Sequence, residues 1–153
     1  MPISIQRATP ADLDALLLLM GHMQLDDPWD QPPDESIVRR NLLELLQNPI
    51  YGFAFIARDK QLPIAYMVIC FDFSLEYRGK GAWVDELFVE PTYRGQGIAS
   101  QLLDRAEQAS LAHGAQTLHL EVTRGNQAIE LYRRRGFHDH NRYLMTKWLN
   151  PPT

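Results

Sequence analysis

The stretch Val84–Ser100, VDELFVEPTYRGQGIAS, constrains the fold more than any other part of the chain. Its first half is rich in apolar and β-branched residues and ends at Pro91, as expected of a strand that stops where proline interrupts the hydrogen-bond ladder. Gly95 and Gly97 follow, and from Ile98 apolar residues recur at helical spacing. Free N–H groups and the positive end of the helix dipole meet at such a helix start. The stretch therefore predicts a phosphate-binding loop.

Strand and helix patterns alternate through the rest of the chain. Alternating or continuous apolar runs predict strands, and apolar residues at helical spacing behind capping residues predict helices. The expected strands cover residues 3–7, 53–57, 64–73, 84–89 and 118–122, with closing strands at Phe137 and Tyr143–Trp148. The expected helices cover about 10–23, 34–48, 97–113 and 126–135. This order predicts one α/β domain over residues 1–153, with a mixed sheet and helices on both faces.

Composition narrows the classes of function. The formal net charge of −4 and the lack of a Lys/Arg run predict no nucleic-acid partner. No segment approaches 18 consecutive apolar residues and the N-terminus has no leader pattern, so we expect no membrane partner and a cytoplasmic protein. The single Cys70 lies in an apolar run, which indicates a buried, unreactive thiol. Scattered histidines without thiol partners predict no metal site.

The segments Arg94–Ala99, RGQGIA, and Asn126–Tyr132, NQAIELY, resemble the signatures of the GCN5-related N-acetyltransferase (GNAT) superfamily. Arg94–Ala99, RGQGIA, fits the superfamily signature Q/R-x-x-G-x-G/A. Asn126–Tyr132, NQAIELY, followed by Gly136 and Phe137, resembles the second signature, N-x-x-A-x-x-x-Y-x-x-x-G-F, with the alanine one position early. The resemblance extends over essentially the whole chain. It implies the GNAT-like acyl-CoA N-acyltransferase fold, with a mostly antiparallel sheet of six to seven strands.

The resemblance also implies a cofactor site for acetyl-CoA as co-substrate. In the superfamily the glycine loop holds the pyrophosphate, and the preceding strand opens from its neighbour so that its backbone pairs with the pantetheine arm. The residues implied in this sequence are Leu87, Phe88, Val89, Arg94, Gly95, Gln96, Gly97, Ile98, Ala99, Ser100, Asn126 and Ala128. Arg94 has a plainer alternative as a surface arginine.

Tyr132 is implied to be the general acid that protonates the departing coenzyme A thiolate. A phenol is a neutral donor at pH 7 and suits this task. A core aromatic residue at a helix surface is the alternative, and taken alone it is the better one. Asn126 before Tyr132, and Gly136 with Phe137 after it, favour the catalytic role.

The carboxylate pair Asp85 and Glu86 supplies two candidates for the base that deprotonates the acceptor amine. Strict strand alternation sends the two side chains to opposite faces of the sheet, with Glu86 on the face of Phe88. In the amine acetylators that this segment resembles, an acidic residue occupies the position of Asp85, so Asp85 is narrowly favoured. Each carboxylate has the alternative of an ordinary charge at the edge of the sheet.

Three further residues are candidates for binding the acceptor. Glu76 and Tyr77 follow the strand next to Val84–Ser100, although an exposed polar turn is the better explanation of these two residues. Trp29 lies in the acidic loop DDPWD, which favours a cationic amine through charge and cation–π attraction unless the loop is merely solvated.

These features together predict an N-acetyltransferase that moves an acetyl group to a primary amine of a small, cationic molecule by direct attack in a ternary complex. A protein lysine or N-terminal acetyltransferase is one alternative, and a non-catalytic acyl-CoA sensor is another. The exposed edge of the expected strand Tyr143–Trp148 also makes a homodimer plausible.

Overall fold

A computed structural model describes residues 2–150 of the chain. The chain forms two compact units, residues 1–120 and residues 121–153, and each is described by itself. The single domain over residues 1–153 expected from the sequence therefore stays a prediction.

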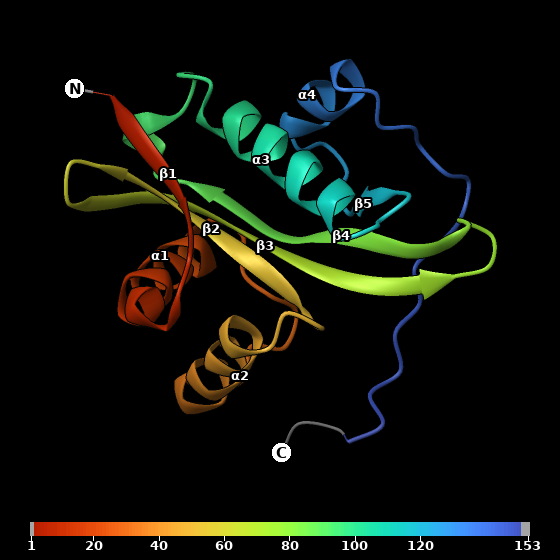
Figure 1. The fold of residues 1–153 in the computed structure, drawn as a ribbon, viewed down its shortest axis with the longest axis horizontal. Coiled ribbons are helices and arrows are strands. Elements are labelled where there is room, and N and C mark those ends of the chain that lie inside the picture. Colours follow the sequence, from red (N-terminus) through yellow and green to blue (C-terminus); the bar gives the residue numbers. More distant parts are fainter. Residues whose placement is uncertain (1, 151–153) are drawn as a thin grey trace. The chain divides into compact units, whose positions relative to one another are not determined.

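The first unit is built on a mixed sheet of five strands in the spatial order β1-β2-β3-β4-β5. Strands β1 to β4 pair antiparallel, and β5 pairs parallel to β4. The strands are β1 Ile3–Arg7, β2 Gly52–Asp59, β3 Leu62–Ser74, β4 Gly79–Val89 and β5 Leu118–Leu120. The long hairpin of β3 and β4 forms the centre of the unit and carries the stretch that the sequence singled out (Figure 1).

A tight hairpin turn connects β2 and β3. Only Lys60 and Gln61 separate the strands, and Asp59 pairs directly with Leu62. Lys60 adopts a φ of 56°, a left-handed conformation that the turn requires. This hairpin fixes the register of β2 against β3.

Helices cover both faces of the sheet, as expected. Helices α1 Leu13–Asp26 and α2 Glu35–Gln47 pack on one face, and α3 Ile98–Ala112 packs on the other (Figure 1). The core between α1, α2 and the sheet includes Leu16, Leu42 and Tyr66. Full burial of one such aliphatic side chain stabilises the fold by about 1.5–3 kcal/mol, so α1 and α2 are firmly seated on the strands that carry the candidate site.

The second unit contains one helix, α4 Ala128–Arg134, and no strand among residues 121–150. The expected closing strands at Phe137 and Tyr143–Trp148 are therefore wrong, and the sheet has five strands instead of six or seven. Tyr143 is 86% exposed and Met145 is 89% exposed. An apolar pattern marks a segment that suits a strand, but a strand also needs a hydrogen-bonded neighbour, and none pairs with this segment in the described residues. The edge on which the homodimer prediction rested is likewise not found there.

No helix within residues 2–150 combines the length and the apolar character needed to cross a bilayer.

Candidate active site

A β-bulge in β4 shapes the candidate site. Glu86 pairs with Val68, and Val84 pairs with the next residue of β3, Ile69. Asp85, which lies between Val84 and Glu86, therefore has no pairing partner on β3. A bulge of this kind interrupts the strict alternation of side chains along a strand. Asp85 and Glu86 consequently border the same cavity. The prediction that the two carboxylates point to opposite faces is wrong because it assumed an unbroken strand.

The cavity lies in the first unit, between the sheet and the two helices α1 and α2. Its volume is about 180 Å³, small compared with the roughly 300–1,000 Å³ of pockets for drug-sized ligands. The walls are mainly apolar: Met20, Val38, Leu42, Leu45 and Val68. The polar groups at the cavity are Asn41, the indole of Trp29 and the carboxylates of Asp85 and Glu86.

The two carboxylates differ in their electrostatic environment. Burial raises the pKa of Glu86 to about 8, with a further contribution from the negative charge of Asp85, while the side chain of Trp29 hydrogen-bonds Glu86 and partly offsets the rise. Burial also raises the pKa of Asp85, although this side chain keeps substantial exposure to solvent. Glu86 is thus a carboxylate whose pKa lies near neutral pH, as a general base requires.

Two neighbouring side chains respond to the same charges. Tyr66 is completely buried, and its pKa is raised by burial and then by the charges of Glu86 and Asp85. Burial and the same two carboxylates raise the pKa of the Cys70 thiol to about 12. Cys70 is therefore protonated at neutral pH and unsuited to act as a nucleophile, in agreement with the sequence analysis.

The glycine loop fits the binding of a phosphate. Gly97 occupies the N-cap position of α3 with a φ of 80°, and Gly95 has a φ of 75°. No side chain caps the helix, and the first backbone hydrogen bond runs from the N–H of Gln101 to the carbonyl of Gly97. The N–H groups of Ile98, Ala99 and Ser100 therefore precede the helical ladder and are available to an anion.

Strand β4 loses one neighbour just before this loop. Its pairing with β5 ends at Val84, so the stretch Leu87–Val89 is paired with β3 alone among residues 2–120. This opening corresponds to the one expected from the resemblance. One outward carbonyl is already engaged, because Arg94 Nε donates to the oxygen of Val89 at 2.9 Å.

Arg94 is held by protein groups rather than directed at the loop. Its Nη2 pairs with the Asp26 carboxylate at 2.7 Å, and its guanidinium lies 5.7 Å from the centre of the Phe88 ring. A second pair, His22 with Glu90, also joins α1 to the end of β4. In this structure Arg94 anchors the start of the loop to α1.

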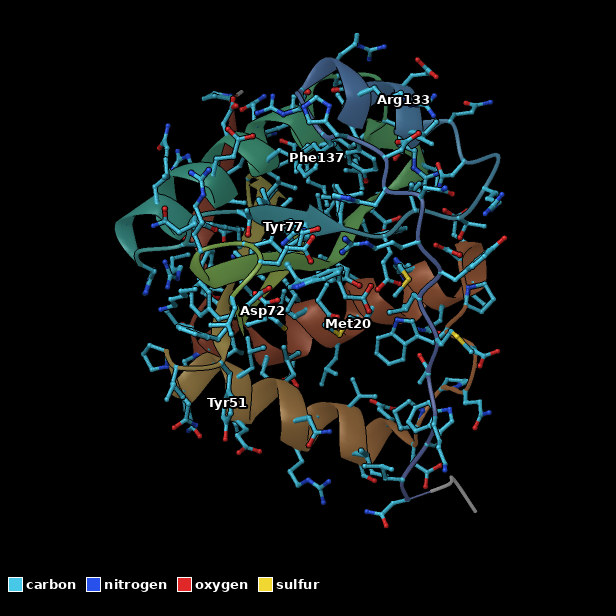
Figure 2. All side chains as sticks on the ribbon, turned by 90° about the vertical axis from the view of Figure 1, so that its right-hand side faces the viewer. Met20, Tyr51, Asp72, Tyr77, Arg133 and Phe137 are labelled. Atoms are coloured by element: carbon cyan, nitrogen blue, oxygen red, sulfur yellow. The ribbon has the colours of Figure 1, made fainter. Side chains whose placement is uncertain are left out.

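Of the three candidates for acceptor binding, Trp29 borders the cavity, whereas Glu76 and Tyr77 do not. Trp29 borders the cavity, and its backbone N–H donates to Gln24 Oε1 at 3.0 Å. Glu76 and Tyr77 lie in the turn between β3 and β4 and do not border this cavity. Tyr77 instead packs edge-on against the His119 ring, with 4.5 Å between the ring centres. Figure 2 shows Tyr77 at the hairpin and Met20 on α1, in separate parts of the first unit.

The second unit carries the other signature. Asn126 Oδ1 accepts a hydrogen bond from the Ala128 N–H at 2.9 Å and so starts α4. Tyr132 on α4 is half-buried and packs edge-on against Phe137 with 5.8 Å between the ring centres. Burial raises the pKa of Tyr132, which keeps the phenol protonated at neutral pH.

Sequence reasoning missed the walls of the cavity. Val38, Leu42 and Leu45 repeat at helical spacing on α2, and that pattern is the ordinary signal for core residues. The polar Asn41 beside them was the only hint in the sequence that this face of α2 borders a cavity.

The sequence was compared with known protein families and with individual known proteins. Residues 18–137 match the acetyltransferase (GNAT) family. A thialysine N-epsilon-acetyltransferase from Bos taurus is 31% identical over 77 residues, which are 50% of this chain and 45% of that protein. An acetyltransferase from Yersinia pestis (strain Pestoides F) is 28% identical over 118 residues, 77% of this chain and 74% of that protein. The matched part is thus less than half the length of the bovine relative.

Solved structures agree with the fold. An integron cassette protein from the mobile metagenome of Cole Harbour Salt Marsh superimposes with a TM-score of 0.84 at 27% identity, covering 97% of this chain and 91% of that one. A predicted acetyltransferase from Clostridium acetobutylicum, solved with acetyl-CoA, has a TM-score of 0.82 at 21% identity, with 95% and 96% coverage. The family match over residues 18–137 and the shared fold lead to one conclusion: this chain belongs to the GNAT family of acetyltransferases.

Proposed function

We propose that the chain is an acetyl-CoA-dependent N-acetyltransferase that acts on a primary amine of a small, cationic acceptor. The observation that carries the proposal is the bulge in β4, which brings Asp85 and Glu86 to one cavity at the point where β4 parts from β5. The uncapped start of α3 supports binding of the coenzyme A phosphates at the N–H groups of the glycine loop. Arg94 supports this loop through its bonds to Val89 and Asp26.

The proposed chemistry follows from the charge states of the side chains. Acetyl-CoA supplies the acetyl group as a thioester. An amine arrives as ammonium, and Glu86 accepts its proton, directly or through water, with Asp85 raising the proton affinity of Glu86. The freed nitrogen lone pair forms the new C–N bond as the C–S bond breaks. The nitrogen releases its second proton to solvent as the amide forms. Tyr132, kept protonated by its raised pKa, donates a proton to the leaving sulfur. Tyr132 regains a proton from solvent after each turnover.

Release of coenzyme A thiol in the presence of an amine is the direct test. The protein is incubated with acetyl-CoA and a panel of primary amines, and free thiol is measured alongside calorimetric binding of acetyl-CoA. Amine-dependent thiol release supports the transferase. Tight binding of acetyl-CoA with no thiol release from any amine or lysine peptide would indicate the acyl-CoA sensor instead.

Replacing Gly97 by valine tests the phosphate-binding loop. A valine at a φ of 80° strains the backbone. A Cβ at this position meets no atom within 4 Å, so we expect the fold to survive the substitution. Loss of hydrogen bonds to a charged phosphate is expected to weaken acetyl-CoA binding by about 10- to 100-fold, measured by calorimetry.

The matched control is Gly114→Val, at the other end of α3. Gly114 also has a left-handed φ, 84°, and open space around its Cβ position. Both variants should lose similar stability, but only Gly97→Val should lose affinity. Equal affinities of the two variants would remove the glycine loop from the cofactor site.

Tyr132→Phe tests the proton donor. Removing the phenol hydroxyl is expected to lower kcat by about 100-fold, within the range for general acid catalysis, and to leave acetyl-CoA affinity unchanged. Tyr143→Phe is the control, because Tyr143 is 86% exposed in the same unit. A Tyr132→Phe enzyme with the parental kcat would assign the proton to water.

A further inference from the structure

Among the described residues that line the cavity at Glu86, the charged side chains both lie on β4, and Asn41 adds an uncharged polar group from α2. The carboxylates and the Trp29 indole lie together, whereas the walls formed by α1, α2 and β3 present the apolar side chains of Met20, Val38, Leu42, Leu45 and Val68. Met20 lies on α1, which packs on the same face of the sheet as α2 (Figure 2). A ligand that fills the cavity therefore meets charge at its amine and mainly hydrocarbon along the rest of its length.

A second cavity continues the first. Its volume is about 410 Å³, and it shares Met20, Trp29, Pro33 and Val38 with the first cavity. Among the described residues that line it, Glu35 is the one carboxylate, and it is exposed to solvent in the first turn of α2. The shared wall between the two cavities is apolar, so apolar contact extends beyond the first cavity.

Neither cavity has a lysine or arginine among the described residues that line it. His22 borders the second cavity, but its side chain is paired with Glu90. The carboxylate of an amino-acid acceptor would enter these cavities without a cationic partner, and a buried unpaired charge is strongly unfavourable. An ammonium farther along an extended polyamine would lie beyond Asp85 and Glu86, against apolar walls where the solvent-exposed Glu35 is the carboxylate within the lining.

We propose that the acceptor is a small primary amine carried on an uncharged apolar body, aryl or alkyl, with neither a carboxylate nor a second ammonium group. This inference rests on the proposed function and specifies its substrate class. The ammonium lies at Glu86, with the Trp29 ring available for cation–π attraction. The body packs on Val38, Leu42 and Val68. Removal of this apolar surface from water supplies the affinity, and the lack of a cationic partner rejects amino acids.

Matched pairs of amines test the inference on the unmodified protein. Thiol release with acetyl-CoA is measured for phenethylamine against phenylalanine, which adds a carboxylate, and for hexylamine against hexamethylenediamine, which adds an ammonium. We expect kcat/KM to be about 100-fold higher for the first member of each pair, the order of magnitude for leaving one charge unpaired. Higher kcat/KM for lysine, spermidine or kanamycin than for both apolar amines would overturn the inference while leaving the transferase standing.

A variant changes the predicted preference. Val38→Asp places a carboxylate on the apolar wall, and we expect it to raise kcat/KM for hexamethylenediamine relative to hexylamine by at least about 10-fold. Ile37→Asp is the control, because Ile37 precedes it on α2 and borders neither cavity. An unchanged preference in a folded Val38→Asp protein would contradict the inference. If the Val38→Asp protein does not fold, the matched pairs of amines measured on the parent protein test the inference by themselves. Binding of acetyl-CoA with no turnover of any amine would refute the proposed function, and the inference with it.

Discussion

Glu86→Gln is expected to lower kcat/KM by about 100- to 10,000-fold, the span typical of a general base, with no change in acetyl-CoA affinity. The amide keeps the size of the side chain and the contact with Trp29 but cannot accept the ammonium proton. Steady-state thiol release and calorimetry measure the two quantities. Glu44→Gln, at an exposed position of α2, is the control and should retain parental rates.

The dependence of the rate on pH separates Glu86 from Asp85. Because the pKa of Glu86 is raised to about 8, kcat/KM of the parent enzyme should rise with pH through that value. Glu86→Gln should lack this inflection. Asp85→Asn should keep most of the activity and move the inflection to lower pH, because the charge of Asp85 contributes to the raised pKa. Loss of activity in Asp85→Asn with a normal Glu86→Gln enzyme would make Asp85 the base.

The same shift has a consequence for stability. Glu86 binds its proton more tightly in the folded state than in the unfolded state, where the pKa is 4.5, so its contribution to the free energy of unfolding is greatest below pH 4.5. That contribution falls as the pH rises from 4.5 to about 8 and stays low above. Glu86→Gln should therefore have a higher Tm than the parent at pH 9 and gain nothing at pH 4. An equal difference at both pH values would contradict the raised pKa.

Gly52→Ala is expected to destabilise the first unit by about 2–5 kcal/mol. Gly52 begins β2 opposite Cys70 with a φ of 151°, and a Cβ would lie 1.8 Å from the carbonyl oxygen of Ile69. That oxygen belongs to the backbone of β3 and cannot move aside without breaking the pairing of β2 with β3. Overpacking and a strained backbone each cost about 1–3 kcal/mol. For a chain of this size the Tm should fall by roughly 10 °C.

Gly21→Ala is the matched comparison. Gly21 lies within α1, and a Cβ there meets no atom within 4 Å. Alanine is the better helix former by about 0.8–1.0 kcal/mol, so this variant should raise the Tm slightly. Thermal unfolding followed by circular dichroism measures both variants. A Gly52→Ala protein as stable as the parent would show that the close approach of β2 to Ile69 is not required.

The segments that sequence patterns predicted well are those whose local signals agree with their tertiary surroundings. Helix α3 begins at Ile98, directly after Gly97, as the glycine signal indicated. Strand β4 ends at Val89, before Pro91. In each case one residue type strongly restricts the backbone at that position, so no distant contact was needed to predict the boundary.

Predictions that needed a partner elsewhere in the chain were less successful. Tyr143–Trp148 has strand-like composition, but it pairs with no strand in the part of the chain that the structure describes. Asp85 and Glu86 were assigned to opposite faces because alternation is a local rule. The bulge that interrupts this alternation depends on the register of β4 against β3. That register is set by contacts between the two strands and cannot be predicted from the residues next to Asp85 and Glu86.

The sequence alone determined the strand, the glycine turn and the helix of Val84–Ser100, because glycine and proline restrict the backbone locally. It also placed Asp85 and Glu86 next to that turn. Only the tertiary structure decided that both carboxylates border one cavity and that its walls are apolar. The physical reason is that a cavity is made by side chains from separate elements, here α1, α2, β3 and β4. Their convergence, together with the burial that raises the pKa of Glu86 to about 8, exists only after the chain has folded.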